Sequence, residues 1–119
     1  MKNKNYIILK NFFTDMHDFS REHGFFRFAY QSRAHWMIIC LIGCNQNNGI
    51  AFEEICNSID RSVISRSTIQ NILDNGNLQK IFLKKKSNND GRIKLYFLSE
   101  NAFLNVNKWI ERQNYIFSN

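Results

Sequence analysis

Half of the lysines and arginines, the side chains that could bind an anion, lie in one part of the chain, residues 61–94. This segment holds eight basic and two acidic residues, which account for the whole formal net charge of +6 carried by the 119-residue chain. The flanking segments, 1–60 and 95–119, each have equal numbers of basic and acidic residues. Because charge concentrated in this way creates a local positive potential, we expect an acidic partner to bind at residues 61–94.

The polar segment 65–71, inside this basic block, carries side chains that can donate hydrogen bonds in pairs. An arginine can bind guanine in this way, and a glutamine or an asparagine can bind adenine, at the base edges exposed in the major groove of DNA. The motif Ser67-Thr68-Ile69-Gln70 predicts a capping box that opens a helix with an exposed polar face. The residues that we predict to contact DNA from this helix are Ser65, Arg66, Ser67, Thr68, Gln70 and Asn71.

A second group of basic and amide side chains surrounds a predicted β-hairpin. Residues 81–83 and 93–98 have the composition of strands, and residues 87–91 between them favour a turn. Bases on such a hairpin can bind DNA phosphates, and an arginine at its tip can enter the minor groove. The alternative is a solvated edge that resists the addition of further strands. The candidate residues are Lys84, Lys85, Lys86, Asn88, Asn89, Asp90, Arg92 and Lys94.

Several helices must position these two groups. Apolar periodicity predicts helices over residues 5–22, 33–44 and 52–59, the second of them buried on nearly every side. The helix that opens at Ser67 is expected to be weakened or ended by Asn75-Gly76-Asn77. A C-terminal helix is capped by Ser99, residues 45–49 and 60–65 are a loop and a turn, and the aromatic segment 25–30 is a connector without an assigned structure.

This order of elements predicts a winged helix-turn-helix, a mostly α fold of the α+β class. We predict a single domain over residues 1–119, with an N-terminal helix and connector at 1–32, the winged helix-turn-helix core at 33–98 and a C-terminal helix at 99–119. The terminal helices carry more apolar side chains than a small monomer needs to bury, which favours a homodimer over the alternative of core packing alone. The candidate dimerisation residues are Leu9, Phe12, Phe13, Phe103, Val106, Trp109 and Ile110.

Residues 67–100 resemble the MarR (multiple-antibiotic-resistance regulator) family. The resemblance rests on four motifs that fall in the family's register without a gap, namely Ser67-Thr68, Ile72-Leu73, Asp90-Gly91-Arg92 and Leu98-Ser99-Glu100. It implies a dimeric transcriptional regulator. Members of this family are often released from DNA by a small phenolic ligand or by oxidation of a thiol. The resemblance also implies that Arg92 is a minor-groove arginine and that Asp90 orients it. The chain departs from the family in four ways, which are Lys80 where a glycine is usual, a longer turn before Ser67, the poor cap Ala51 at the start of the short second helix, and a shorter C-terminal arm.

Other signals are weaker. The three cysteines, Cys40, Cys44 and Cys56, are an odd number without metal-ligand spacing, so we expect buried thiols in a reducing cytoplasm, with redox sensing as the alternative. The aromatic segment 25–30 and Trp36 are expected in the core, with an effector pocket as the alternative. No catalytic motif or cofactor site is recognised, which predicts a protein that is not an enzyme. No apolar run is long enough to span a membrane.

These observations predict a cytoplasmic homodimer that binds double-stranded DNA sequence-specifically, with the polar helix in the major groove and the basic hairpin on phosphates or in the minor groove. The alternative is a winged-helix module that docks a protein or a nucleoprotein complex, for example in plasmid or phage replication, without a sequence-specific operator. The two hypotheses share a fold and differ in whether duplex binding persists as the salt concentration rises.

Overall fold

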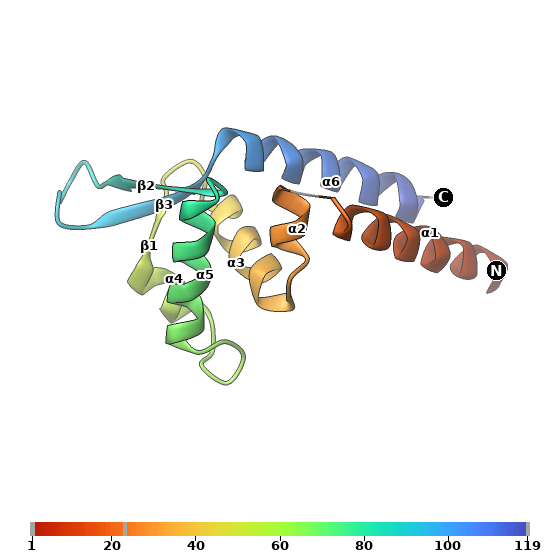
Figure 1. Ribbon diagram of the computed structural model, residues 1–119, viewed down its shortest axis with the longest axis horizontal. Coiled ribbons are helices and arrows are strands. Elements are labelled where there is room, and N and C mark those ends of the chain that lie inside the picture. Colours follow the sequence, from red (N-terminus) through yellow and green to blue (C-terminus); the bar gives the residue numbers. More distant parts are fainter. Residues whose placement is uncertain (1, 23, 119) are drawn as a thin grey trace.

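Helices dominate the chain, and a small sheet extends from one end of it (Figure 1). The computed structural model describes residues 2–22 and 24–118, and in these it has six helices and three strands. The helices are α1 (Lys2–Ser20), α2 (Phe25–Ala29), α3 (Arg33–Cys44), α4 (Phe52–Ser58), α5 (Arg66–Leu78) and α6 (Glu100–Ser118), and the strands are β1 (Ile50–Ala51), β2 (Phe82–Lys86) and β3 (Lys94–Leu98). The predicted fold class, a mostly α winged helix-turn-helix, is confirmed. The predicted domain range also includes Met1, His23 and Asn119, which lie outside the described residues.

Helix α3 has the bounds predicted for it, 33–44, and packs into the core. It is not buried on nearly every side as expected, since Arg33, Cys40 and Cys44 are exposed. Its three isoleucines, Ile38, Ile39 and Ile42, are fully buried. The connector at 25–30, which had no predicted structure, forms the short helix α2. The rings of Phe25, Phe26 and Phe28 are buried in the same core, as expected. Trp36 is partly buried against this core and also lines a groove between α3 and α6.

The expectation of buried cysteines is wrong for two of the three. Cys40 and Cys44 are exposed, whereas Cys56 is half-buried and packs against the core. Residues four apart in a helix share one face, and on α3 this face borders a groove of about 380 Å³ between α3 and α6. The sequence could not show this, because the exposure depends on where α6 lies.

The strands form one antiparallel sheet in the order β1-β3-β2. The β2–β3 pair is the predicted hairpin. Strand β2 begins one residue later than the predicted segment 81–83, and it ends later because the ladder extends to the Lys86–Lys94 pair. Strand β1 has only two residues and was not predicted. The side chain of Gln46 supports β3, since its amide accepts from the Leu98 N–H at 2.8 Å and donates to the Leu98 carbonyl at 2.9 Å.

Helices α4 and α5, with the turn at 60–65, make the helix-turn-helix. The predicted capping box at Ser67 is wrong: the cap is Ser65, whose extended backbone lets its Oγ accept the Thr68 N–H at 3.2 Å. Ser67 therefore lies inside the first turn of α5. Helix α4 has the apolar cap Ala51, and Glu54 reaches back to accept the Ala51 N–H at 3.1 Å.

A tight junction, which we define as Gly76–Phe82, joins α5 to the hairpin. Helix α5 runs through Asn75-Gly76-Asn77 and ends one residue later, at Leu78, so this motif does not end it. Gly76 lies against the Phe82 ring, where a Cβ would overlap it. Lys80 has a φ of 61°, the left-handed conformation that favours glycine. The Ile81 N–H donates to the Gly76 carbonyl at 2.8 Å, and the Ile81 carbonyl accepts from the Ser99 N–H at 2.9 Å. Ile81 thus connects α5 directly to the cap of α6.

Helices α1 and α6 lie side by side and extend away from the sheet, with both chain ends beyond them (Figure 1). The buried carboxylate of Asp15 on α1 holds this pair together by accepting from Arg112 and, at 3.0 Å, from the amide of Gln113. Phe12 contacts Phe117 near the end of α6. Within the described residues, no helix is both long and apolar enough to cross a membrane.

Candidate nucleic-acid interface

The first turn of α5 presents a set of exposed polar side chains. Ser65, Arg66, Ser67 and Thr68 are all exposed, while Ile69 behind them is buried. The Ser65 hydroxyl donates to the Thr68 hydroxyl at 2.9 Å, in addition to its capping bond. The unpaired backbone N–H groups and the dipole of a helix N-terminus favour a negative group here, which agrees with a phosphate or a base edge as ligand.

Arg66 is held by two residues of α4. Its Nη1 donates to Glu53 Oε1 at 3.1 Å, and its Nη2 donates to Glu53 Oε2. The guanidinium carbon also lies 4.8 Å from the centre of the Phe52 ring. These bonds lower the pKa of Glu53 and raise that of Arg66, so both side chains carry their charges at neutral pH. Neither Glu53 nor Phe52 was among the predicted site residues.

The two amide candidates on α5 differ. Gln70 is half-buried, although an exposed position was expected, since its side chain lies close to Tyr96 of β3. Its Nε2 donates to Asp74 at 2.9 Å. Burial is the largest reason that the pKa of Tyr96 is raised. Asn71 is exposed on the next position. Of the two, Asn71 is therefore the better placed to bind a base.

The bases of the hairpin, hereafter the wing (residues 82–98), lie on two opposite faces. Side chains alternate along a strand, so Lys84, Lys86 and their partners Tyr96 and Lys94 share one face, and Lys85 lies on the other. The first face points toward α5, since Tyr96 contacts Gln70 there. Lys85 instead lies over the Phe97 ring, 5.2 Å from its centre.

Lys86 and Lys94 lie directly opposite each other on the face toward α5. Like charges at facing positions of a ladder destabilise it. Both side chains are exposed, so an anion between them would relieve this repulsion. This face of the wing is therefore suited to a phosphate.

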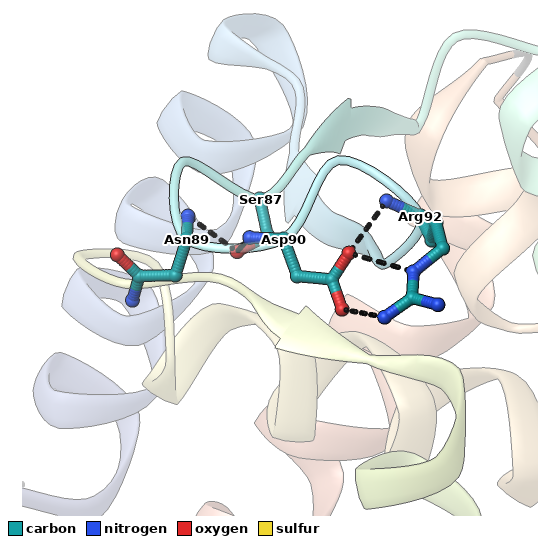
Figure 2. A network of polar contacts seen from close by, with 4 residues as sticks. All are labelled: Ser87, Asn89, Asp90 and Arg92. Atoms are coloured by element: carbon teal, nitrogen blue, oxygen red, sulfur yellow. Dashed lines mark hydrogen bonds and ion pairs between the residues drawn. The ribbon is translucent and has the colours of Figure 1, made fainter.

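The tip of the wing is ordered by its own hydrogen bonds (Figure 2). Asp90 Oδ1 accepts from the backbone N–H of Arg92 at 3.0 Å and from its Nε at 3.1 Å, and Asp90 Oδ2 accepts from its Nη2 at 3.1 Å. These bonds lower the pKa of Asp90. The Arg92 side chain is nevertheless 91% exposed. The contact that the MarR resemblance implies between Asp90 and Arg92 is thus present, and Arg92 is free to contact a ligand.

The other amide candidates also lie at the tip. Asn88 and Asn89 are exposed, and the Ser87 hydroxyl accepts from the Asn89 N–H at 3.2 Å. They border a polar cavity of about 500 Å³ between the wing and the turn that follows α3, which also includes Lys85. This cavity lies on the face of the wing opposite to Lys84.

The predicted dimerisation residues fall into two groups. Val106 and Trp109 pack against the chain's own core, and the Trp109 Nε1 donates to the Tyr30 hydroxyl at 3.0 Å. The remaining five keep accessible surface, most of all Leu9 and Phe13 on α1, which are 62% and 63% exposed. The less exposed members of this group are Phe12, Phe103 and Ile110.

Within 2–22 and 24–118, no cluster of three or more His, Cys, Asp or Glu side chains could hold a metal ion. Desolvation raises the pKa of the Cys56 thiol, and desolvation together with the neighbouring Cys44 raises that of Cys40, which still keeps accessible surface.

The comparisons with known proteins agree with the fold. The sequence matches no protein-family model and no curated protein. A solved structure similar to this chain is that of ZitR from Lactococcus lactis, determined as a double mutant. The two share 16% sequence identity with a TM-score of 0.58, over 92% of this chain and 75% of that one. At this identity the likeness shows the fold alone, and the fold it shows extends over nearly all of the chain.

Proposed function

We propose that the chain is a MarR-like transcriptional regulator that binds double-stranded DNA sequence-specifically as a homodimer. The observation that carries this proposal is the position of the charge. Residues 61–94, which hold the whole net charge of +6, form the turn before α5, α5 itself and most of the wing. In the proposed complex, α5 lies in the major groove, and the wing contacts phosphates and places Arg92 in the minor groove.

The relative positions of α5 and the wing support this arrangement. Tyr96 of β3 contacts Gln70 of α5, and the wing face that carries Lys84, Lys86 and Lys94 is the face of Tyr96. Lys84, Lys86 and Lys94 therefore lie on the side of the wing that points toward the polar helix. A duplex that enters here meets both groups at once.

A second copy of the chain is the proposed partner of α1 and α6. The wing and the paired helices lie at opposite ends of the molecule, whose longest extent is 54 Å (Figure 1). Contact through the apolar ends of α1 and α6 thus leaves both wings accessible. Two recognition helices would then enter successive major grooves about 34 Å apart, so we expect an operator with an inverted repeat. Light scattering tests this part, and a monomer at micromolar concentration would contradict it.

We propose no catalytic role and a cytoplasmic location, in keeping with DNA as the partner. Selection of binding sites from random duplexes tests the sequence specificity. Enrichment of an inverted repeat is the expected result. Duplex binding that vanishes near physiological salt, with no enriched sequence, would instead favour the protein-docking module.

The salt dependence of binding tests the interface itself. We expect the triple variant Lys84→Ala, Lys86→Ala and Arg92→Ala to reduce the slope of log affinity against log salt by roughly 2.7, because each neutralised phosphate contributes about 0.9. A matched control removes three exposed bases far from the wing, Lys4, Lys10 and Arg21. The control has the same net charge as the triple variant. Equal slopes for the two variants would contradict the proposed interface.

A further inference from the structure

Glu53 is an acidic residue in direct contact with a candidate DNA-binding arginine. Its two carboxylate oxygens accept from both terminal nitrogens of Arg66, and the Phe52 ring lies beneath the guanidinium. A carboxylate at a DNA interface repels phosphates, so its presence weakens general affinity for DNA. The side chains of Glu53 and Arg66 are 64% and 47% exposed, and an exposed ion pair contributes little to stability. Neither affinity nor folding therefore explains the pair.

The geometry leaves one edge of the guanidinium available. Arginine has five N–H donors in a fixed planar fork. Glu53 occupies the end of the fork, with one hydrogen from Nη1 and one from Nη2. The Nε–H and the second Nη2–H lie on the adjacent edge, and no hydrogen bond from Nε occurs within the described residues. Two parallel donors of this kind match the O6 and N7 acceptors that guanine exposes in the major groove.

The position of Arg66 places this edge where bases are read. Arg66 is the first residue of α5, and recognition helices contact base edges from their N-terminal residues. Its guanidinium is held from two sides by α4, by the Glu53 carboxylate and by the Phe52 ring. A side chain fixed in this way loses less conformational freedom when it binds, and it also reaches fewer alternative acceptors.

On this basis, and resting on the proposed function, we propose that Glu53 is a positioning residue that directs Arg66 to a guanine in the major groove. Glu53 itself touches no base in this proposal. It makes the arginine selective for one base, at the expense of general attraction to DNA. Gln70 differs from Arg66 in that its carboxylate partner, Asp74, lies on the same helix.

The test uses the full chain and random double-stranded DNA. Binding sites are selected with the wild-type chain and with the Arg66→Ala variant. A position at which the wild-type chain prefers one base and Arg66→Ala prefers none is taken as the position that Arg66 reads. We expect this base to be guanine, preferred by roughly 10- to 100-fold over the other bases. Fluorescence anisotropy then compares the selected duplex with one that carries A·T at this position, for each variant.

Glu53→Gln is expected to reduce the preference for guanine by roughly 3- to 10-fold, because the amide makes weaker bonds with arginine than the carboxylate does. Its affinity for random duplex is expected to stay equal or to rise. The matched control is Glu54→Gln, the next residue of α4, whose carboxylate bonds to the Ala51 N–H instead of Arg66. The control makes the same change in charge and should leave the guanine preference unchanged. Circular dichroism checks that all variants are folded.

The outcomes separate the two proposals. If a motif is enriched but Glu53→Gln keeps the wild-type preference, or if the base read by Arg66 is not guanine, the role of Glu53 is overturned while the proposed function stands. If Glu53→Gln still changes base preference in an Arg66→Ala background, Glu53 does not act through Arg66 and the inference is overturned as well. If no motif is enriched, both proposals fail together.

Discussion

Two arginines of the candidate interface are each bound by a carboxylate, but the separation in sequence between arginine and carboxylate differs between the two pairs. Asp90 and Arg92 are two residues apart in one turn, whereas Glu53 and Arg66 are on different helices. The tip of the wing therefore needs only its own sequence to place its arginine. The placement of Arg66 depends on how α4 and α5 pack. The Asp90–Arg92 pair fits a DNA contact that does not select a single base, and the Glu53–Arg66 pair fits the reading of a particular base.

The largest expected effect separates the two arginines directly. Arg66→Ala should weaken binding to the selected operator by roughly 1–3 kcal/mol and change binding to random duplex much less, because it removes a base contact. Arg92→Ala should weaken binding to both duplexes without loss of preference at a single base pair, because a minor-groove arginine responds to groove width and not to one base edge. Titrations of both duplexes at several salt concentrations measure this. Loss of preference at a single base pair in Arg92→Ala would show that the two arginines do not differ in this way.

The second prediction concerns the junction between α5 and the wing. Gly76→Ala should lower the free energy of unfolding by about 1–3 kcal/mol, since the added methyl group overlaps the buried Phe82 ring. This loss exceeds the gain of up to about 1 kcal/mol that alanine brings to a helix interior. Urea denaturation measures it. Gly91→Ala is the control, because a Cβ there meets open space. A more stable Gly76→Ala variant would mean that the junction is not tightly packed.

A smaller effect of the opposite sign is expected at Lys80. Lys80→Gly should raise the free energy of unfolding by about 1 kcal/mol, because glycine adopts the left-handed conformation without the steric penalty that Lys80 has. The same measurement on Gln79→Gly provides the comparison. Gln79 has a φ of −84°, so glycine should bring it no gain. Equal effects at both positions would contradict a strained Lys80.

The smallest effect is expected from pH. The pKa values of Asp90 and Glu53 are both lowered, by hydrogen bonds from Arg92 and Arg66 respectively. Because the pKa of each carboxylate is lowered, the stabilisation from each ion pair is fully present above the ordinary carboxyl pKa, about 4. It is lost only as the pH falls through the lowered pKa. Between pH 8 and about 6, neither arginine should be released. Carboxylate chemical shifts followed by NMR test this, and a transition near neutral pH in either residue would contradict it.

The parts of the fold that follow local patterns were predictable from the sequence. The apolar run of α3, the Ser99 cap of α6 and the turn residues of the wing each predict their element without reference to the rest of the chain. The Asp90–Arg92 contact belongs here too, since the two residues share one turn. The start of α5 was harder, because Ser65 and Ser67 are each followed three residues later by a side chain that suits a capping motif.

The remaining features depend on tertiary packing, which a local pattern does not contain. The contact between Glu53 and Arg66 exists because the turn at 60–65 brings two helices together, and Glu53 by itself is typical of any first helical turn. The half-buried position of Gln70 depends on Tyr96, which lies on a strand that follows it by more than twenty residues. The exposure of Cys40 depends likewise on the course of α6.

The junction at Ile81 has a consequence for how the chain would recognise DNA. Because Ile81 bonds to Gly76 at one side and to Ser99 at the other, the angle between α5 and the wing is set before any duplex arrives. The spacing between α5 and the wing is therefore fixed when DNA binds. A duplex must present grooves at the matching spacing or bend until it does, and the energy of bending depends on base sequence. Selectivity would therefore extend to base pairs between the two contacts, which no side chain touches.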